Sequence, residues 1–284
     1  MRLIGAVTEG SGDTNEDGMG VLGRKENIAA AWVFDGVTGI NDRNYLPGGS
    51  DAAWLVHRAH FHLLKLAETD APLPEILSQL VTALIVDWKI ESARYELPLD
   101  YDPPAACLIF AKRYAAGWSA LRLGDSILLA QTQSDRFLMF EESSNTGFDS
   151  WLSAEAQKRR AQGQFSVGAL LAEFRPQLRA SRKTRNTAES FGILKADLAA
   201  AHNAEYLELG FPKNLLICTD GFYRAVDHYG LHDNQSLLAT CGQEGGTDNI
   251  MKKVRVVEQS DPQCQKYMRF KPADDASAVM LAKL

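Results

Sequence analysis

The chain has 284 residues, of which 45% are hydrophobic and 23% are charged. This composition is typical of globular proteins and excludes a disordered, collagen-like or coiled-coil chain. The formal net charge is −6, which gives no overall positive field to hold the phosphates of a nucleic-acid duplex. We therefore expect no nucleic-acid partner.

The apolar segments of the chain are short. The longest, 28–34 and 80–86, fall far below the roughly 20 residues that a bilayer span requires, and the first residues turn polar at Thr8 and Glu9, too early for a signal peptide. The four cysteines include no Cys-x-x-Cys pair, which is typical of reduced, structural thiols. We predict a cytoplasmic protein without a membrane partner.

The first part of the chain predicts strands followed by two helices. Short apolar segments punctuated by Gly or Asp indicate strands at residues 2–8, 18–22 and 28–34. Ser50 is expected to cap a helix that ends near Glu68, and apolar residues at the helical period over 76–88 predict a second helix. Because prolines interrupt the chain at 72–74, the two helices should pack as an antiparallel pair.

The second part of the chain predicts a mixture of both kinds of element. A meander of antiparallel strands is expected at 106–113, 118–123 and 127–132. Helical spacing returns from Ser150 to about Arg182, and further strands are expected at 191–194, 214–219 and 277–282. Strands, then helices, then strands predict an α+β domain in which helices cover sheets.

Aspartates, mostly beside glycine, recur where the predicted strands begin or end. They are Asp17, Asp35, Asp125, Asp220 and Asp274. Strand ends are rigid, so these carboxylates can converge on one point, and hard oxygen ligands of this kind suit Mg²⁺ or Mn²⁺. Carboxylates that lie so close repel each other unless cations lie among them. Two such ions about 3.5–4 Å apart can share a water, lower its pKa and direct it in line at phosphorus.

As an ordered set, these motifs resemble the metal-dependent protein serine/threonine phosphatases of type 2C, the PPM family, in a bacterial-type member. The matching segments are Asn-Glu-Asp (15–17), Asp-Gly-x-x-Gly (35–39), Pro-Ala-Ala-Cys (104–107), Gly-Asp-Ser (124–126), Thr-Asp-Gly (219–221) and Asp-Asp-x-Ser (274–277). The resemblance spans essentially the whole chain. It implies a four-layer αββα sandwich, two antiparallel β-sheets flanked by pairs of helices, in a single catalytic domain over residues 1–284.

The resemblance also implies a centre of two Mn²⁺ or Mg²⁺ ions. By position, Asp35 would bridge both ions and the carbonyl group of Gly36 would ligate one of them. Asp220 and Asp274 would complete the ligands of the other ion.

Three further acidic residues receive roles from the same resemblance. Glu16 and Asp17 would hold metal-bound waters, so that with Asp35 they form the expected catalytic set. Asp125 lies where many bacterial members hold a third ion together with the aspartate of Thr-Asp-Gly, and a third ion stays an open alternative.

Two features of the family are missing. The family usually carries an arginine four residues before the glutamate of Asn-Glu-Asp, where it grips the substrate phosphate, and here that residue is Gly12. Eukaryotic members place a histidine after Asp-Gly, and here it is Val37. Arg43 and the basic segment 179–185, which includes Arg182, are the substitutes that we consider. A solvated helix end is the alternative for that segment.

The last metal ligand can be assigned in two ways. Asp248, in Thr-Asp-Asn-Ile, also resembles the closing motif of the family. Residues 251–255, which follow it, are too basic for a buried closing strand, whereas 277–282 is apolar. We therefore choose Asp274.

Taken with the resemblance, the sequence predicts a protein phosphatase. It would hydrolyse phosphoserine or phosphothreonine in a phosphorylated protein substrate by attack of a hydroxide that bridges two metal ions, without a covalent intermediate. Two alternatives stay open: a catalytically weak, phosphoprotein-binding regulator on the same fold, and a metal-dependent hydrolase of small phosphate esters.

Overall fold

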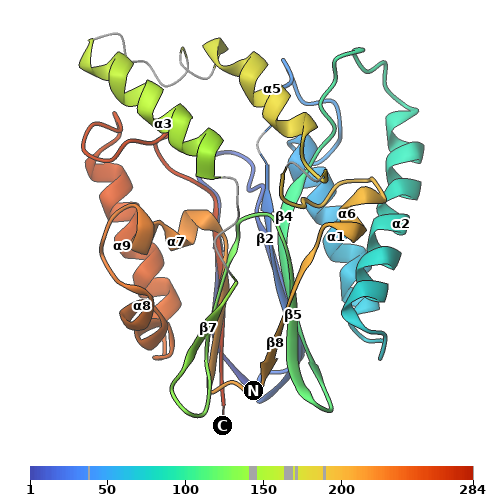
Figure 1. Cartoon of the computed structure of the whole chain (residues 1–284), viewed down its shortest axis with the longest axis vertical. Coiled ribbons are helices and arrows are strands. Elements are labelled where there is room, and N and C mark those ends of the chain that lie inside the picture. The colour runs from blue at the N-terminus through green and yellow to red at the C-terminus, as the bar shows by residue number, and fades with distance from the viewer. Residues whose placement is uncertain (38, 141–145, 163–168, 170–171, 188–189, 284) are drawn as a thin grey trace.

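The fold consists of two five-stranded antiparallel sheets that lie face to face, with helices on both outer faces (Figure 1). This computed structural model describes residues 1–284 apart from 38, 141–145, 163–168, 170–171, 188–189 and 284. The four-layer αββα sandwich that the resemblance implied is confirmed.

The first sheet has the strand order β2-β3-β4-β5-β8. Its strands are β2 (Gly18–Arg24), β3 (Asn27–Gly36), β4 (Ala106–Tyr114), β5 (Gly117–Leu123) and β8 (Glu205–Gly210). In β3, Trp32 and Phe34 pack against the helices, while Ala31 and Val33 pack against the other sheet. The period of two along a strand that is apolar on both faces explains why its sequence is a continuous hydrophobic run.

The second sheet has the order β1-β10-β9-β6-β7. Its strands are β1 (Arg2–Glu9), β10 (Ala276–Ala282), β9 (Asn214–Cys218), β6 (Ile127–Gln131) and β7 (Phe137–Met139). Leu215 and Ile217 of β9 face the first sheet, whereas Leu216 and Cys218 face the helices outside. The core between the sheets therefore joins segments from both ends of the chain.

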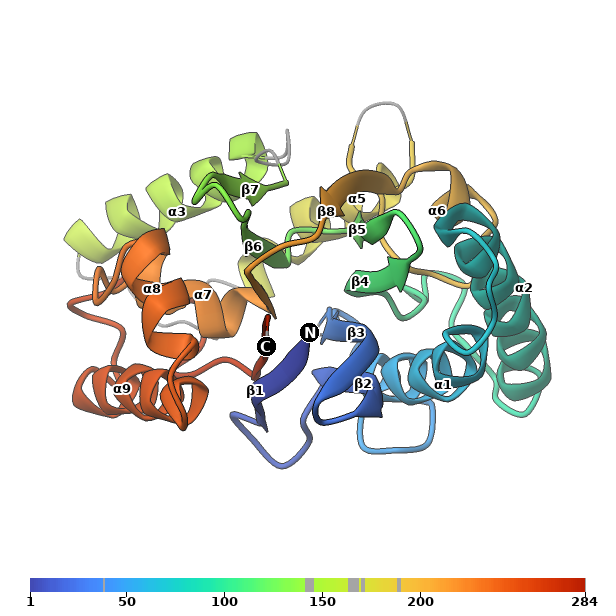
Figure 2. The same cartoon turned by 90° about the horizontal axis from the view of Figure 1, so that it is seen from below.

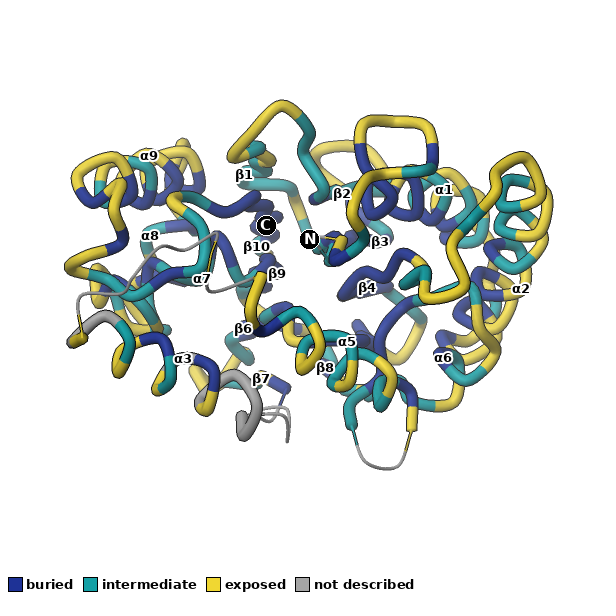
Figure 3. Tube along the Cα trace, turned by 90° about the horizontal axis from the view of Figure 1, so that it is seen from above, coloured by how far each residue is buried: buried dark blue, intermediate teal, exposed yellow. Residues whose placement is uncertain are grey.

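Each sheet carries its own helical layer, as the view from below shows (Figure 2). The first sheet is covered by α1 (Asp51–Leu66), α2 (Leu73–Ser92) and the short α6 (Ala199–His202). The second is covered by α7 (Asp220–Asp227), α8 (Asn234–Cys241) and α9 (Gly246–Ser260). The tube coloured by burial shows buried residues along β4, β9 and β10 between these layers (Figure 3).

Two more helices, α3 (Thr146–Ala161) and α5 (Arg175–Lys183), lie across one end of the sandwich, opposite the end where both termini lie (Figure 1). Leu152 and Phe174 form a small separate cluster there with Leu178 and the loop residues Met268 and Phe270. Within the described part of the chain, no helix combines the length and the apolar character that crossing a bilayer requires.

The predicted helix cap at Ser50 is present, since its hydroxyl accepts a hydrogen bond from the amide of Ala53 at 3.1 Å. The predicted meander over 106–132 is wrong at its last step, because β6 pairs with β9 and β7 in the other sheet. The chain changes sheets at Gly124, whose φ of +90° and close approach to Cys107 both require glycine.

The predicted strand at 191–194 is also wrong. Within it, only Leu194 makes a ladder contact, an isolated bridge to Ala106. Part of the helical stretch predicted from 150 to 182 falls on 163–168 and 170–171, outside the described residues. The sequence prediction also omitted β7, β8 and the helices α7, α8 and α9.

Candidate metal centre

Strand ends from both sheets meet beneath α5. Chain direction and register place the end of β3, the start of β4 and the end of β5 at the same end of the first sheet, where Asp35 pairs with Cys107. In the second sheet, the end of β9 and the starts of β6 and β10 lie at the same end of the sandwich, with Cys218 opposite both Ile127 and Ala278. The aspartates that precede or follow these strands are thus brought together, as the sequence predicted.

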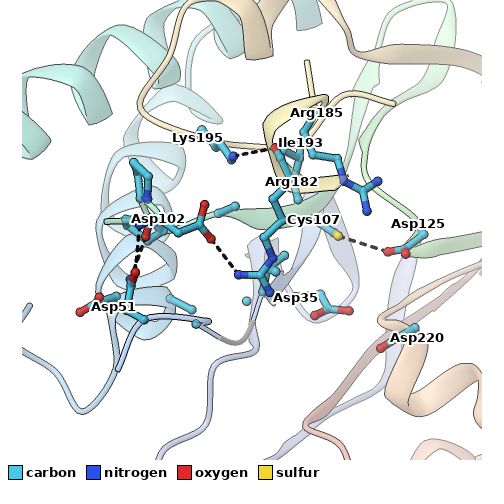
Figure 4. A pocket seen from close by; sticks show the side chains of 18 of the residues that line it. Asp35, Asp51, Asp102, Cys107, Asp125, Arg182, Arg185, Ile193, Lys195 and Asp220 are labelled. Atoms are coloured by element: carbon cyan, nitrogen blue, oxygen red, sulfur yellow. Dashed lines mark hydrogen bonds and ion pairs between the residues drawn. The ribbon is translucent and has the colours of Figure 1, made fainter. Parts of the chain in front are cut away.

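A cavity of about 210 Å³ opens between these strand ends. Six of the predicted site residues line it, namely Asp35, Gly36, Asp125, Arg182, Asp220 and Asp274. Figure 4 shows Asp35, Asp125 and Asp220 near one another, with Arg182 reaching toward Asp35 from α5. Glu16, Asp17 and Arg43 are not among the lining residues.

Asp35 lies at the centre of the acidic group. Burial raises the pKa of its carboxyl group, and the carboxylates of Asp220, Asp17, Asp125 and Asp274 raise it further. Among the described residues, its side chain has neither a hydrogen-bond donor nor an ion-pair partner. Asp35 is half-buried, and a carboxylate that is partly removed from water without a partner is costly unless it is protonated or a cation binds it, so this position favours a cation.

Asp17 lies behind that group, just before β2. It is buried, and the hydroxyl group of Thr219 donates to it at 2.8 Å. Burial raises the pKa of Asp17 well above its usual range, the Thr219 hydrogen bond opposes the rise, and the carboxylates of Asp220 and Asp274 add to it. Asp17 therefore belongs electrostatically to the same cluster.

Asp274 differs from Asp35 in having cationic partners. Its carboxylate forms ion pairs with Arg224, on the second turn of α7, and with Lys271. Burial and Asp220 still raise its pKa, while the two cations act in the opposite direction. Asp248, the alternative last ligand, lies exposed in the first turn of α9 and lines neither this cavity nor the larger one beside it.

The loop that carries Glu16 is fixed by Asp275. One carboxylate oxygen of Asp275 accepts from the amide and hydroxyl groups of Ser11 at 2.6 and 2.8 Å, and the other accepts from the amide of Glu16 at 2.6 Å. The backbone of Glu16 lies so close to Gly36 that a Cβ at position 36 would be 2.4 Å from the Glu16 carbonyl oxygen. Glycine at 36 thus allows the two predicted motifs to touch.

Asp125 has a partner that the sequence did not indicate. The thiol group of Cys107 donates to Asp125 at 3.2 Å (Figure 4). Burial raises the pKa of this thiol well above its usual range, with Asp125 and Asp35 raising it further. Cys107 is therefore held as a neutral donor.

The donor chemistry of the cavity fits divalent cations. Asp35, Asp220 and Asp274 offer hard carboxylate oxygens, and the Gly36 carbonyl offers a neutral one. These carboxylates repel one another, and bound cations would offset that repulsion. Within the described ranges, however, no three Asp, Glu, His or Cys side chains are already close enough to enclose one ion. Water molecules and the carbonyl group of Gly36 would therefore have to supply part of the ligands of each ion.

The two arginines expected near the substrate lie in different places. Arg182 lines the cavity and donates to Asp102 at 2.8 Å (Figure 4). Arg43 is exposed, with its guanidinium group 4.8 Å from the centre of the Tyr45 ring. Lys271 also lines the cavity, and it could not be recognised in the sequence because one lysine in a loop carries no motif of its own.

The comparisons with known proteins agree with this architecture. The family described as Protein phosphatase 2C matches residues 4–253, a range that ends before Asp274. No curated protein matches the sequence.

Several solved structures share the fold. The Mycobacterium tuberculosis serine/threonine phosphatase PstP/Ppp is 12% identical, with a TM-score of 0.56 over 97% of this chain and 96% of that one. Stp1 from Staphylococcus aureus is 14% identical, with a TM-score of 0.55 over 100% and 97%. The PstP catalytic domain in complex with 2 manganese ions is 12% identical, with a TM-score of 0.54 over 97% and 95%. With a family match over most of its length, the chain belongs to the protein phosphatase 2C family.

Proposed function

We propose that this protein is a Mn²⁺- or Mg²⁺-dependent protein phosphatase that hydrolyses phosphoserine and phosphothreonine. The observation that carries the proposal is the cluster formed by Asp35, Asp17, Asp220 and Asp274 at one end of the sandwich, in which Asp17 and Asp274 are buried and Asp35 and Asp220 are half-buried. Family membership supports the reaction, and the two manganese ions in the PstP complex support the choice of cation.

Each predicted ligand keeps its role in this proposal. Asp35 and the carbonyl group of Gly36 face the cavity from β3, while Asp220 and Asp274 face it from the second sheet. When bound, the ions would supply a water of lowered pKa, positioned for in-line attack at phosphorus. The alkoxide of the serine or threonine leaves as phosphorus gains the new oxygen.

The remaining acids support that arrangement. Asp17 and Glu16 would hold water molecules at the back of the centre, since Asp17 is fixed by Thr219 and the Glu16 amide by Asp275. Asp125 would add a third site at the edge of the cavity. Because both sheets contribute ligands, we propose that residues 1–284 act as one catalytic domain.

The substrate-binding role belongs to Arg182 more than to Arg43. We expect Arg182→Ala to raise KM for a phosphothreonine peptide by roughly 10-fold, because a charge-assisted hydrogen bond to phosphate is lost at the cavity wall. Arg43→Ala should change KM less than about 2-fold, because Arg43 is exposed and outside the cavity. Steady-state kinetics of both variants at saturating Mn²⁺ tests this order, and a larger effect at Arg43 would reverse the assignment.

The test of the proposed function is phosphate release from a phosphothreonine peptide with and without Mn²⁺. We expect turnover with Mn²⁺ that a chelator abolishes and that added Mn²⁺ restores. Absence of Mn²⁺-dependent turnover, while the peptide still binds, would favour a phosphoprotein-binding regulator. Equal kcat/KM for the peptide and for p-nitrophenyl phosphate would favour a hydrolase of small phosphate esters.

A further inference from the structure

Four basic side chains line the cavity of the candidate metal centre: Arg182, Arg185, Lys195 and Lys271. The first three belong to α5 and the segment that follows it, while Lys271 belongs to the loop before β10. A phosphate monoester carries up to two negative charges, and it must approach a wall of carboxylates. The position of these cations therefore decides where a phosphate can be held.

The three cations from the α5 side lie near other groups. Arg182 donates to Asp102 at 2.8 Å, and Lys195 donates to the carbonyl group of Arg182 at 3.5 Å. The guanidinium group of Arg185 lies 3.6 Å from the centre of the Phe191 ring. Arg182 and Lys195 thus place their charge near Asp102, whereas Arg185 lies over the Phe191 ring.

Lys271 lies at the carboxylates themselves. Its ammonium group forms an ion pair with Asp274. Burial lowers the pKa of Lys271, but the carboxylates of Asp274, Asp35 and Asp220 raise it above its usual value. Of the four, only Lys271 forms a described ion pair with one of the proposed metal ligands. Its side chain is 39% exposed, so that the ammonium group remains in reach of a ligand in the cavity.

Lys271 also lies where two cavities meet. Besides the cavity of 210 Å³, it lines a larger one of about 760 Å³ whose walls include Leu178 of α5 and the loop residues Met268 and Phe270. Asp220 and Asp274 also line both cavities. The ammonium group of Lys271 is thus next to carboxylates that can be reached from either cavity.

The ion pairs of Asp274 show how Lys271 could change partner. Arg224, the other cation on Asp274, is largely buried and also lies 3.6 Å from Glu258, so it is held from two sides. Lysine has a flexible four-carbon stem and a compact charge with three donors. Once a divalent cation satisfies the Asp274 carboxylate, the Lys271 ammonium can turn to an anion in the cavity while Arg224 stays in place.

We propose that Lys271 binds the phosphate group of the substrate at the junction of the two cavities. This inference rests on the proposed phosphatase function, because it assumes that cations occupy the carboxylate cluster. Lys271 would thus supply a phosphate-binding cation next to the reacting centre. The family's arginine, which usually has this role, is replaced by Gly12 in this chain.

The test compares Lys271→Met with Lys271→Arg and with Lys266→Met, a control that removes the same charge from an exposed position of the same loop. In protein saturated with Mn²⁺, we expect Lys271→Met to weaken the binding of inorganic phosphate, measured by calorimetry, by about 10- to 100-fold. KM for the phosphothreonine peptide should rise in parallel. Lys271→Arg should recover part of the affinity, and Lys266→Met should match the wild type.

A separate titration of the metal-free protein with Mn²⁺ tests the change of partner. Because Lys271 would no longer compete for Asp274, Lys271→Met should bind Mn²⁺ as tightly as the wild type or more tightly. Phosphate affinity within about 2-fold of the wild type would overturn the proposal, and so would a loss that Lys266→Met shares. Wild-type protein that binds phosphate through Lys271 without any turnover would instead contradict the proposed function and leave the binding site intact.

Discussion

Asp35→Asn should abolish most of the activity and at the same time leave the fold intact. We expect kcat to fall by roughly 10³-fold, because the carboxylate that we propose as a metal ligand would be replaced by a neutral amide of nearly the same size. The carboxyl group of Asp35 lies among four other carboxylates that raise its pKa. Removing its charge relieves that repulsion, and so the metal-free variant should melt at the same temperature as the wild type or higher.

The two effects are measured on the same protein samples. Steady-state kinetics gives the loss of kcat, and thermal denaturation with and without Mn²⁺ gives the stabilisation that metal binding provides. We expect Mn²⁺ to raise the melting temperature of the wild type and to have little effect on Asp35→Asn. Asp248→Asn is the matched control, because this residue is exposed on α9. Turnover by Asp35→Asn close to that of the wild type would remove Asp35 from the centre.

Gly221→Ala should disrupt the centre by a steric route. A Cβ at position 221 would be 2.0 Å from the carbonyl oxygen of Asp275 and 3.1 Å from the Cβ of Asp274. The start of α7, which carries Asp220, must then move away from the segment that carries Asp274. Alanine is the better helix former by up to about 1 kcal/mol, but a clash with rigid backbone costs roughly 1–3 kcal/mol. The clash outweighs the gain in helix propensity, so the substitution should destabilise the fold.

We therefore expect Gly221→Ala to lower the free energy of unfolding by about 1–2 kcal/mol and to weaken Mn²⁺ binding by roughly 10-fold or more. Chemical denaturation without metal and calorimetry with Mn²⁺ measure the two quantities. Gly12→Ala is the control, since a Cβ there meets nothing within 4 Å. A Gly221→Ala variant with wild-type stability and wild-type Mn²⁺ affinity would mean that the contact at position 221 relaxes without moving the ligands.

The sequence predicted those parts of the fold that local chemistry determines. The apolar run of β3 ends at Asp35 and Gly36, and Ser50 caps α1 as its side chain requires. β10 is a closing strand because residues 276–282 are almost wholly apolar, and residues 251–255 form part of α9, where basic side chains can face solvent. The secondary structure of these elements therefore follows from their local sequence.

Partners distant in the sequence could not be predicted in the same way. β6 has the composition of a meander strand, but Gly124 turns the chain into the other sheet, and pairing with β9 decides its place. β8, on the edge of the first sheet, alternates between half-buried and exposed residues, and it lacks a strong apolar pattern.

The residues of the candidate site also fall into two groups, those with a local sequence pattern and those whose role depends on distant contacts. The aspartates were predictable because each one terminates a strand or precedes one. Lys271 and Asp275 were not, because their importance lies in contacts with Asp274, Ser11 and Glu16 rather than in any local pattern. Arg43 and Arg182 were equivalent candidates in the sequence, and only the position of α5 over the cavity separates them.

The most direct test of the central claim is a crystal structure of the Mn²⁺-soaked protein with anomalous diffraction measured at the manganese absorption edge. We expect two anomalous peaks about 3.5–4 Å apart in the cavity, with oxygen atoms of Asp35 in contact with both and with Asp220 and Asp274 on one of them. Crystals of Asp35→Asn should lose at least one peak. An empty cavity in saturated wild-type crystals, or manganese bound only at exposed acids such as Asp248, would contradict the account.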